Sequence, residues 1–160
     1  MTLGALLGGF ALQVALEDLG KGEDCDHGGI HRNNCGEFVR LVRGDAKRAA
    51  WCASAVGNRW FREAAHRMHV KLPFVPSHSA RRLFKRMVAG GGVRVTQLSA
   101  GDVVLWARPP NPFSGHIGIV SRVEAGGIFH ALEGNRGPNA KVAEFPHTLS
   151  ERRLLGFVRI

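Results

Sequence analysis

Several features that mark particular classes of protein are scarce or absent in this sequence. Its 160 residues include no tyrosine, only three cysteines and only three methionines. We have no physical account of the missing tyrosine. The odd cysteine count leaves at least one thiol free, so the chain is not a disulfide-stapled scaffold. No stretch reaches the roughly 18 consecutive apolar residues that a membrane-spanning helix requires, which excludes such a helix.

The sequence also lacks a clear secretory leader. Residues 3–16 are fairly apolar, but no lysine or arginine precedes them and no small-residue cleavage site is evident. A signal peptide has both features. We therefore expect this stretch to form a core helix, and we expect the protein to need help in leaving the cytoplasm in which it is made.

Acidic residues are scarce in the middle of the chain. Residues 40–94 hold 13 lysines and arginines but only Asp45 and Glu63, whereas the rest of the chain has nine basic and 11 acidic residues. This segment therefore carries the whole net charge of +9. Such a surface suits a polyanion, either nucleic acid, an anionic membrane or an acidic wall polymer; a solvated helix surface is an equally weighted alternative.

What is present is typical of one soluble domain spanning residues 1–160. The chain is 44% hydrophobic and 22% charged, and its length suffices to bury a core. Periodicity and turn residues predict helices first and strands later, which indicates an α+β fold with N-terminal helices packed on an antiparallel sheet. The expected helices are 5–19, 34–42, 51–67 and 80–88, and the expected strands are 93–95, 103–106, 116–123, 128–132, 141–143 and 155–160.

One cysteine lies where its thiol would be activated. Cys52 falls in the first turn of the predicted helix 51–67, whose apolar stripe includes Val56, Trp60 and Ala64. A thiol attacks carbonyl groups as a thiolate, and a helix N-terminus or a neighbouring imidazolium lowers its pKa. The same unpaired N–H groups can stabilise an oxyanion. The alternative is that Cys52 is a small buried apolar residue.

A base and its orienting group follow downstream. His116 comes after Gly115 at the start of a predicted strand, where a side chain can emerge at the edge of the sheet. Glu133 or Asn135, placed on the loop after the neighbouring strand, can accept a hydrogen bond from the imidazole and fix its tautomer. Cysteine, histidine and an acid or amide are the components of a cysteine acyl-cleaving enzyme.

Five short motifs then occur in the order seen in a known family. They are Asn34–Val39, Trp51–Ala53, Ala100–Val104, Gly115–Val120 and Glu133–Asn135. Together they resemble the CHAP domain, the cysteine, histidine-dependent amidohydrolase/peptidase of the NlpC/P60-type, papain-like superfamily. The resemblance covers about residues 10–160. It implies a papain-like fold with Cys52 as nucleophile, His116 as base and Glu133 or Asn135 as the orienting group.

The resemblance also implies a substrate. Such domains cleave amide bonds of peptidoglycan, either the N-acetylmuramoyl-L-alanine bond or a bond of the stem or cross-bridge peptide. We expect a monomeric phage or prophage endolysin that acts in the periplasm or cell wall after holin release or virion delivery, or an injected antibacterial effector. The basic segment 40–94 would contact an anionic envelope surface, and we expect no nucleic acid partner. The rival is a non-catalytic basic module that binds wall or nucleic acid.

We expect no cofactor and no metal. Some relatives bind calcium just before the nucleophile, but residues 43–50 are basic with one acid. The cluster Cys25, His27, His31 and Cys35 has zinc-binding residue types at a spacing that matches no common zinc motif. Five further histidines are interpreted as surface or structural residues, with His130 the exception that merits a mutational control. They are His66, His69, His78, His130 and His147.

Overall fold

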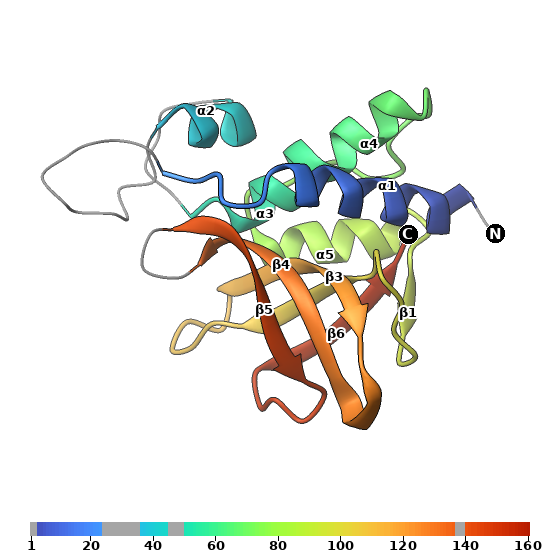
Figure 1. The fold of residues 1–160 in the computed structure, drawn as a ribbon, viewed down its shortest axis with the longest axis vertical. Coiled ribbons are helices and arrows are strands. Elements are labelled where there is room, and N and C mark those ends of the chain that lie inside the picture. The colour runs from blue at the N-terminus through green and yellow to red at the C-terminus, as the bar shows by residue number, and fades with distance from the viewer. Residues whose placement is uncertain (1–2, 24–35, 45–49, 137–139) are drawn as a thin grey trace, which may run out of the picture.

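The helices and strands form two layers, with the α-helices on one side of a single sheet (Figure 1). The structure is a computed structural model that describes residues 3–23, 36–44, 50–136 and 140–160. The predicted α+β class is confirmed. The single domain over residues 1–160 and the monomeric state stay predictions.

The sheet has six strands in the order β1-β6-β2-β3-β4-β5, and every neighbouring pair is antiparallel. All six expected strands are present. Their bounds are β1 (Val93–Val95), β2 (Val103–Ala107), β3 (Gly115–Val123), β4 (Ile128–Arg136), β5 (Lys141–Thr148) and β6 (Leu154–Arg159).

Strands β4 and β5 are longer than the sequence predicts. Glu133 was expected on a loop, but it lies inside β4, opposite Gly118 of β3 and Ala143 of β5. It continues the alternation of Phe129 and Ala131 toward one face of the sheet. A charged side chain at a buried strand position interrupts the hydrophobic pattern, which is why the predicted strand stops too early. Asn135, expected on the same loop, also lies within β4.

The helices match the predicted ranges to within three residues at each end. They are α1 (Leu3–Glu17), α2 (Glu37–Arg43), α3 (Cys52–Ser54), the π-helix η1 (Ala55–Phe61), α4 (Arg62–Arg67) and α5 (Ala80–Ala89). The predicted helix 51–67 is thus one helical run whose centre widens to a π-helix. Asn34, where the second predicted helix begins, lies outside the described residues. None of the helices in the described part of the chain has the length and apolar character to span a bilayer.

The helical run 52–67 is the centre of the core. Its predicted stripe of Val56, Trp60 and Ala64 is fully buried, as is Phe61. The run contacts α1 and α2 on one side and reaches β3 and β4 on the other. Burial on so many sides holds the start of this run, and with it Cys52, in a fixed position relative to the sheet.

The two faces of the sheet carry different clusters. One face packs against the helices, through side chains such as Leu105, Ile117 and Leu132. The opposite face carries a smaller cluster of Val104, Trp106, Val120, Phe129, Ala131 and Phe157. Because side chains alternate along a strand, residues 116 and 133 fall on this second face with Trp106.

A buried carboxylate joins α1 to the π-helix. Asp18 is fully buried just after α1, and it accepts hydrogen bonds from Arg59 Nε at 3.0 Å and Trp60 Nε1 at 3.2 Å. Lys21 Nζ lies 2.9 Å from the same carboxylate. A buried charge is tolerated when it is paired and hydrogen-bonded in this way.

We expect Asp18→Asn to destabilise the fold strongly. The substitution leaves Arg59 partly buried without its counter-charge, a change that costs about 3–5 kcal/mol of unfolding free energy. Urea denaturation followed by circular dichroism measures the loss. Glu17→Gln is the matched control, because Glu17 is an exposed neighbour paired with Arg67 and its loss should change the midpoint little. Equal midpoints for the two variants would contradict a structural role for the Asp18 cluster.

Candidate active site

The candidate nucleophile opens the central helical run. Cys52 is the first residue of α3, it is free, and it is only 3% exposed. Trp51 occupies the N-cap position and makes no side-chain capping bond. The amide groups of the first turn are therefore not satisfied by a capping side chain, and they favour a negative charge on the sulfur.

Close packing against the sheet fixes this helix start. Trp51 is fully buried, donates its indole N–H to Glu23 at 3.2 Å, and meets the ring of Phe38 edge-on at 5.4 Å. A Cβ atom at Gly134 would lie 2.6 Å from the Trp51 ring. Only a glycine in β4 permits this approach, so the Glu-Gly-Asn motif also sets the distance between nucleophile and sheet. Trp51 is thus a core residue and not a wall of the substrate groove.

The candidate base lies at the start of β3. His116 pairs with Trp106 across the β2–β3 ladder, and it is only 8% exposed. Its Nε2 atom lies 2.5 Å from Glu133 Oε2, at an angle outside that of a regular hydrogen bond, so the contact is best described as a charge pair. Nδ1 makes no regular hydrogen bond to any described residue. It is the nitrogen left for proton exchange with the thiol.

The charges of Cys52 and His116 stabilise each other. Burial opposes ionisation of the Cys52 thiol, but the interaction with His116, the charge of Arg108 and the backbone of Ile117 outweigh it, so its pKa is lowered. Burial likewise disfavours the imidazolium, yet contacts with Cys52 and Glu133 raise the pKa of His116 to about 9. Both shifts therefore favour the thiolate–imidazolium form of the pair over its neutral form.

Glu133 supplies the fixed negative charge behind the histidine. Its side chain is fully buried. Burial raises its pKa, but contacts with His116 and His147 and the charge of Arg136 outweigh this and lower the pKa to about 2. The carboxylate consequently stays ionised throughout the neutral range. An ionised partner at Nε2 orients the ring and stabilises its protonated form.

A second histidine holds the other oxygen of Glu133. His147 Nε2, in β5, lies 2.7 Å from Glu133 Oε1, and Arg136 Nη1 contacts the same oxygen. His147 Nδ1 lies 2.8 Å from Glu151 Oε1. Glu151 in turn accepts a hydrogen bond from Trp106 Nε1 at 3.0 Å. The contacts therefore continue from the nucleophile through the sheet to the loop after β5.

Sequence reasoning missed this second half of the site. His147 was interpreted as a surface or structural histidine, and Arg136 and Glu151 were not singled out. Trp106, at the end of the predicted strand 103–106, is buried, and its ring lies 4.6 Å from that of His147 and 5.8 Å from that of His116. No spacing connects these residues, because they meet only through the pairing of β4 with β5. The one available signal was Glu133, a charged residue that continues the alternation of buried residues along β4.

Asn135 occupies a distinctive backbone position. It lies two residues beyond Glu133, in the left-handed region with φ of 61°, where the β4–β5 register shifts. Bulges of this kind often lie beside active sites and redirect a side chain. The structure thus places the carboxylate of Glu133 beside Nε2 of His116. The catalytic role of Asn135 stays a prediction.

His130, the histidine singled out for a mutational control, does not lie beside His116. His130 Nε2 is 2.9 Å from Glu124, on the hairpin that joins β3 and β4. His78 Nδ1 lies 2.6 Å from the buried hydroxyl of Ser54, two residues after Cys52 in the first turn of the same helix. Neither residue lines the cavity beside His116.

Among the described residues, no group of three histidine, cysteine, aspartate or glutamate side chains is arranged so that it could hold a metal ion. The zinc-type cluster of Cys25, His27, His31 and Cys35 lies outside those residues. The nucleophile, base and carboxylate described above form a site that needs no metal to ionise its thiol.

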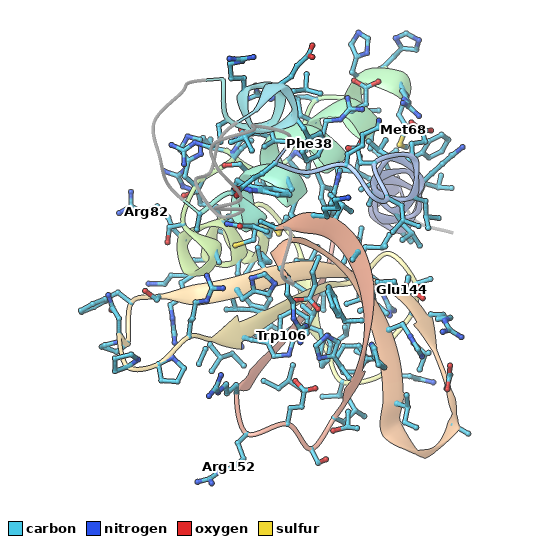
Figure 2. The ribbon with its side chains drawn as sticks, turned by 60° about the vertical axis from the view of Figure 1, so that its left-hand side comes forward. Phe38, Met68, Arg82, Trp106, Glu144 and Arg152 are labelled. Atoms are coloured by element: carbon cyan, nitrogen blue, oxygen red, sulfur yellow. The ribbon has the colours of Figure 1, made fainter. Side chains whose placement is uncertain are left out.

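A cavity of about 540 Å³ adjoins His116 on the second face of the sheet. Figure 2 shows Trp106 among the strands of this layer, with Arg152 on the loop beyond β5 and Phe38 in the helical layer. The wall of the cavity includes Trp106, His116, Glu133, His147 and Glu151, followed by Ala107, Arg108, Arg136, Arg152 and Arg153.

The fold and the site together define the class of protein. A cysteine at a helix start, a histidine on an adjacent strand and a buried carboxylate behind it form the arrangement of papain-like cysteine hydrolases. The CHAP domain family matches residues 26–135, which is more than half of the chain. The chain belongs to this family, and the resemblance predicted from its motifs is confirmed together with the cysteine hydrolase class.

One solved structure agrees at the level of the fold. The crystal structure of Ly7917 matches with a TM-score of 0.50 and 18% identity, over 95% of this chain and 62% of that protein. The structure of Ly7917 with the hydrolyzing product of MDP matches with a TM-score of 0.49 and the same identity and shares. The chain thus spans less than two thirds of Ly7917. No curated protein matches the chain.

We expect Glu133→Gln to narrow the pH range of activity. Removing the negative charge lowers the pKa of His116 from about 9, so the alkaline limb of kcat/KM should move to lower pH by about one to three pH units. The profile of hydrolysis against pH measures the change. Glu144→Gln, which removes a carboxylate on β5 that binds Ser121, should leave both limbs in place. An unmoved alkaline limb in Glu133→Gln would show that Glu133 does not set the ionisation of His116.

His147 should act as a positioning residue for Glu133. His147→Ala removes a hydrogen-bonding partner of a charged group, a contact that contributes about 1.5–3 kcal/mol, so kcat/KM should fall roughly 10- to 100-fold. The alkaline limb should also move down, because a loosened carboxylate stabilises the imidazolium less. His147→Gln can still donate to Glu133 and should recover part of both losses. A rate loss with unchanged pH limbs and no recovery by glutamine would indicate packing alone.

Proposed function

We propose that this protein is a peptidoglycan hydrolase that cleaves an amide bond through an acyl-enzyme on Cys52. The observation that carries the proposal is the meeting of Cys52, His116 and Glu133, with the thiol at a helix start. Membership of the CHAP family supports an amidase or peptidase. The candidate bonds are the N-acetylmuramoyl-L-alanine bond and an amide of the stem or cross-bridge peptide.

In the first step the Cys52 thiolate attacks the carbonyl carbon of the amide. A carbon–sulfur bond forms, and the electrons of the carbonyl double bond move to its oxygen. The backbone N–H of Cys52 and its neighbours in the first turn are the donors placed to stabilise this oxyanion. Preorganised donors of this type are worth the most where burial lowers the local dielectric.

The intermediate collapses when the carbon–nitrogen bond breaks. The His116 imidazolium gives its proton to the departing amine, which leaves a thioester on Cys52 and a neutral imidazole. The neutral imidazole then takes a proton from water as that water attacks the thioester carbonyl. The carbon–sulfur bond breaks, the carboxylic acid product departs, and the thiolate–imidazolium pair is restored. Glu133 stays ionised and holds the ring through both steps.

The biological setting is part of the proposal. We propose a phage or prophage endolysin that is made in the host cytoplasm and acts in the periplasm or cell wall after holin release or virion delivery. Expression inside cells should then be harmless until a holin or a permeabilised membrane gives access to the wall. Inhibition by a protein encoded next to this chain would instead identify an injected effector.

The basic segment 40–94 supports contact with an anionic envelope surface. In helix α5, Arg81 donates to the carbonyl of Ser114 at 2.8 Å and Arg86 to that of Pro76 at 2.7 Å, so both also have structural roles. Arg82 and Lys85 are exposed and are the residues of this helix that we assign to the envelope. A non-catalytic nucleic-acid module is the rival, and it would show affinity that falls steeply with salt and does not depend on Cys52.

We expect the wild-type protein to clear suspensions of outer-membrane-stripped cells and of purified peptidoglycan, and Cys52→Ala to lose clearing by at least three orders of magnitude. Turbidity measures the rate, and mass spectrometry of the released fragments identifies the new termini. Circular dichroism must show that the variant is folded, since Cys52 is buried. Failure of folded wild-type protein to clear several wall types would overturn the proposed function.

A further inference from the structure

The cavity beside His116 is rich in arginine. Arg108, Arg136, Arg152 and Arg153 contribute to its wall, together with two carboxylates. This concentration of positive charge lies outside the basic segment 40–94, on the opposite layer of the molecule. It therefore calls for an explanation separate from contact with the envelope.

The carboxylates in the wall are already engaged. Glu133 is held by His116, His147 and Arg136. Glu151 accepts from Trp106 and contacts His147. Arg136 is used in turn, because it contacts Glu133 and lies over a phenylalanine ring. The two carboxylates of the cavity wall are thus paired with other residues of the same site.

Three arginines remain without such partners. Among the described residues, no side-chain hydrogen bond or ion pair engages the guanidinium groups of Arg108, Arg152 or Arg153, and all three residues are exposed. Their backbones are nevertheless anchored at the sheet: the Ala107 amide donates to the Arg153 carbonyl at 2.7 Å, and the Arg108 amide to the Ser114 carbonyl at 3.4 Å. The structure holds these guanidinium groups at the rim of the cavity, with no side chain of the described residues occupying their donors.

The charge at the rim of this cavity also acts on the candidate nucleophile, Cys52. Arg108 is close enough for its charge to contribute to the lowered pKa of Cys52, and His116 forms part of the wall. His116 therefore belongs both to the candidate catalytic pair and to the wall of the cavity whose rim carries these arginines.

We propose that the cavity is a subsite for carboxylate groups of the peptide substrate, with Arg108, Arg152 and Arg153 as the recognising residues. A guanidinium group pairs with a carboxylate through two parallel hydrogen bonds, which gives both affinity and orientation. The enzyme accordingly prefers stem peptides with free carboxylates over the same peptides with those groups amidated. This inference rests on the proposed function, because the carboxylates belong to the peptide portion of peptidoglycan.

The test uses two soluble muropeptides that differ only in whether the α-carboxyl of D-glutamate and the free carboxyl of diaminopimelate are ionised or amidated. We expect wild-type protein to cleave the free-carboxylate form with a kcat/KM about tenfold or more above that of the amidated form. Arg152→Gln/Arg153→Gln should remove this preference by slowing cleavage of the free form alone. Arg82→Gln/Lys85→Gln, which removes two positive charges from exposed residues of α5, should keep the preference.

A binding measurement tests the carboxylate subsite independently of the proposed hydrolase function. Calorimetry with folded Cys52→Ala measures the Kd of each muropeptide whether or not the wild-type protein cleaves it. Tighter binding of the free form, lost in the double substitution, supports the subsite even if catalysis fails on these substrates. Equal affinity for the two muropeptides, or an equal effect of the double substitution on both, would overturn the subsite while leaving the hydrolase proposal standing.

Discussion

The ionised carboxylate of Glu133, buried inside a strand, is the constraint on which the active site depends. A carboxylate without water needs partners on both oxygens, and it has them: His116 on one, His147 and Arg136 on the other. Movement of β3 relative to β4 would take His116 away from this charge, and movement of β5 would take His147 away, and loss of a partner from a buried charge is costly. The register of three strands is therefore tied to the position of the His116 ring.

The same constraint explains the short side chains around Glu133. A Cβ atom at Gly118 would lie 2.7 Å from the carbonyl of Leu132 and 3.0 Å from Glu133 Cγ. On the other side, Gly134 admits the ring of Trp51. Side chains at these positions would push the carboxylate off His116 or the helix off the sheet. Gly118 and Gly134 thus allow the close packing that fixes β4 relative to His116 and to Cys52.

Much of this architecture could be predicted from the sequence, for reasons that differ between its parts. The helices and most strands follow from local periodicity, and the roles of Cys52 and His116 follow from chemistry that depends on where an element starts. The π-helix at Ala55–Phe61 leaves the same apolar stripe as an α-helix, so no pattern indicates it. His147 and Glu151 join the site only through long-range strand pairing, and one sequence does not reveal which strands pair. The ends of β4 and β5 were missed because the buried charge that matters most for function resembles a loop residue.

The burial that makes the thiol inaccessible to bulk water would, acting alone, make it unreactive, since burial favours the neutral form. Three neighbouring groups of alternating charge reverse this effect and lower the pKa of the thiol. The thiolate of Cys52, the imidazolium of His116 and the carboxylate of Glu133 follow one another, each stabilising the next, and the contacts then run through His147 to Glu151 at the cavity wall. Because the alternating charges satisfy one another, the reactive state of the nucleophile needs no counter-ion from the substrate. Of the outer arginines, Arg108 contributes its charge to the lowered pKa of Cys52, so its position joins substrate recognition to the ionisation of the thiol. Arg152 and Arg153 belong to the proposed recognition of substrate alone.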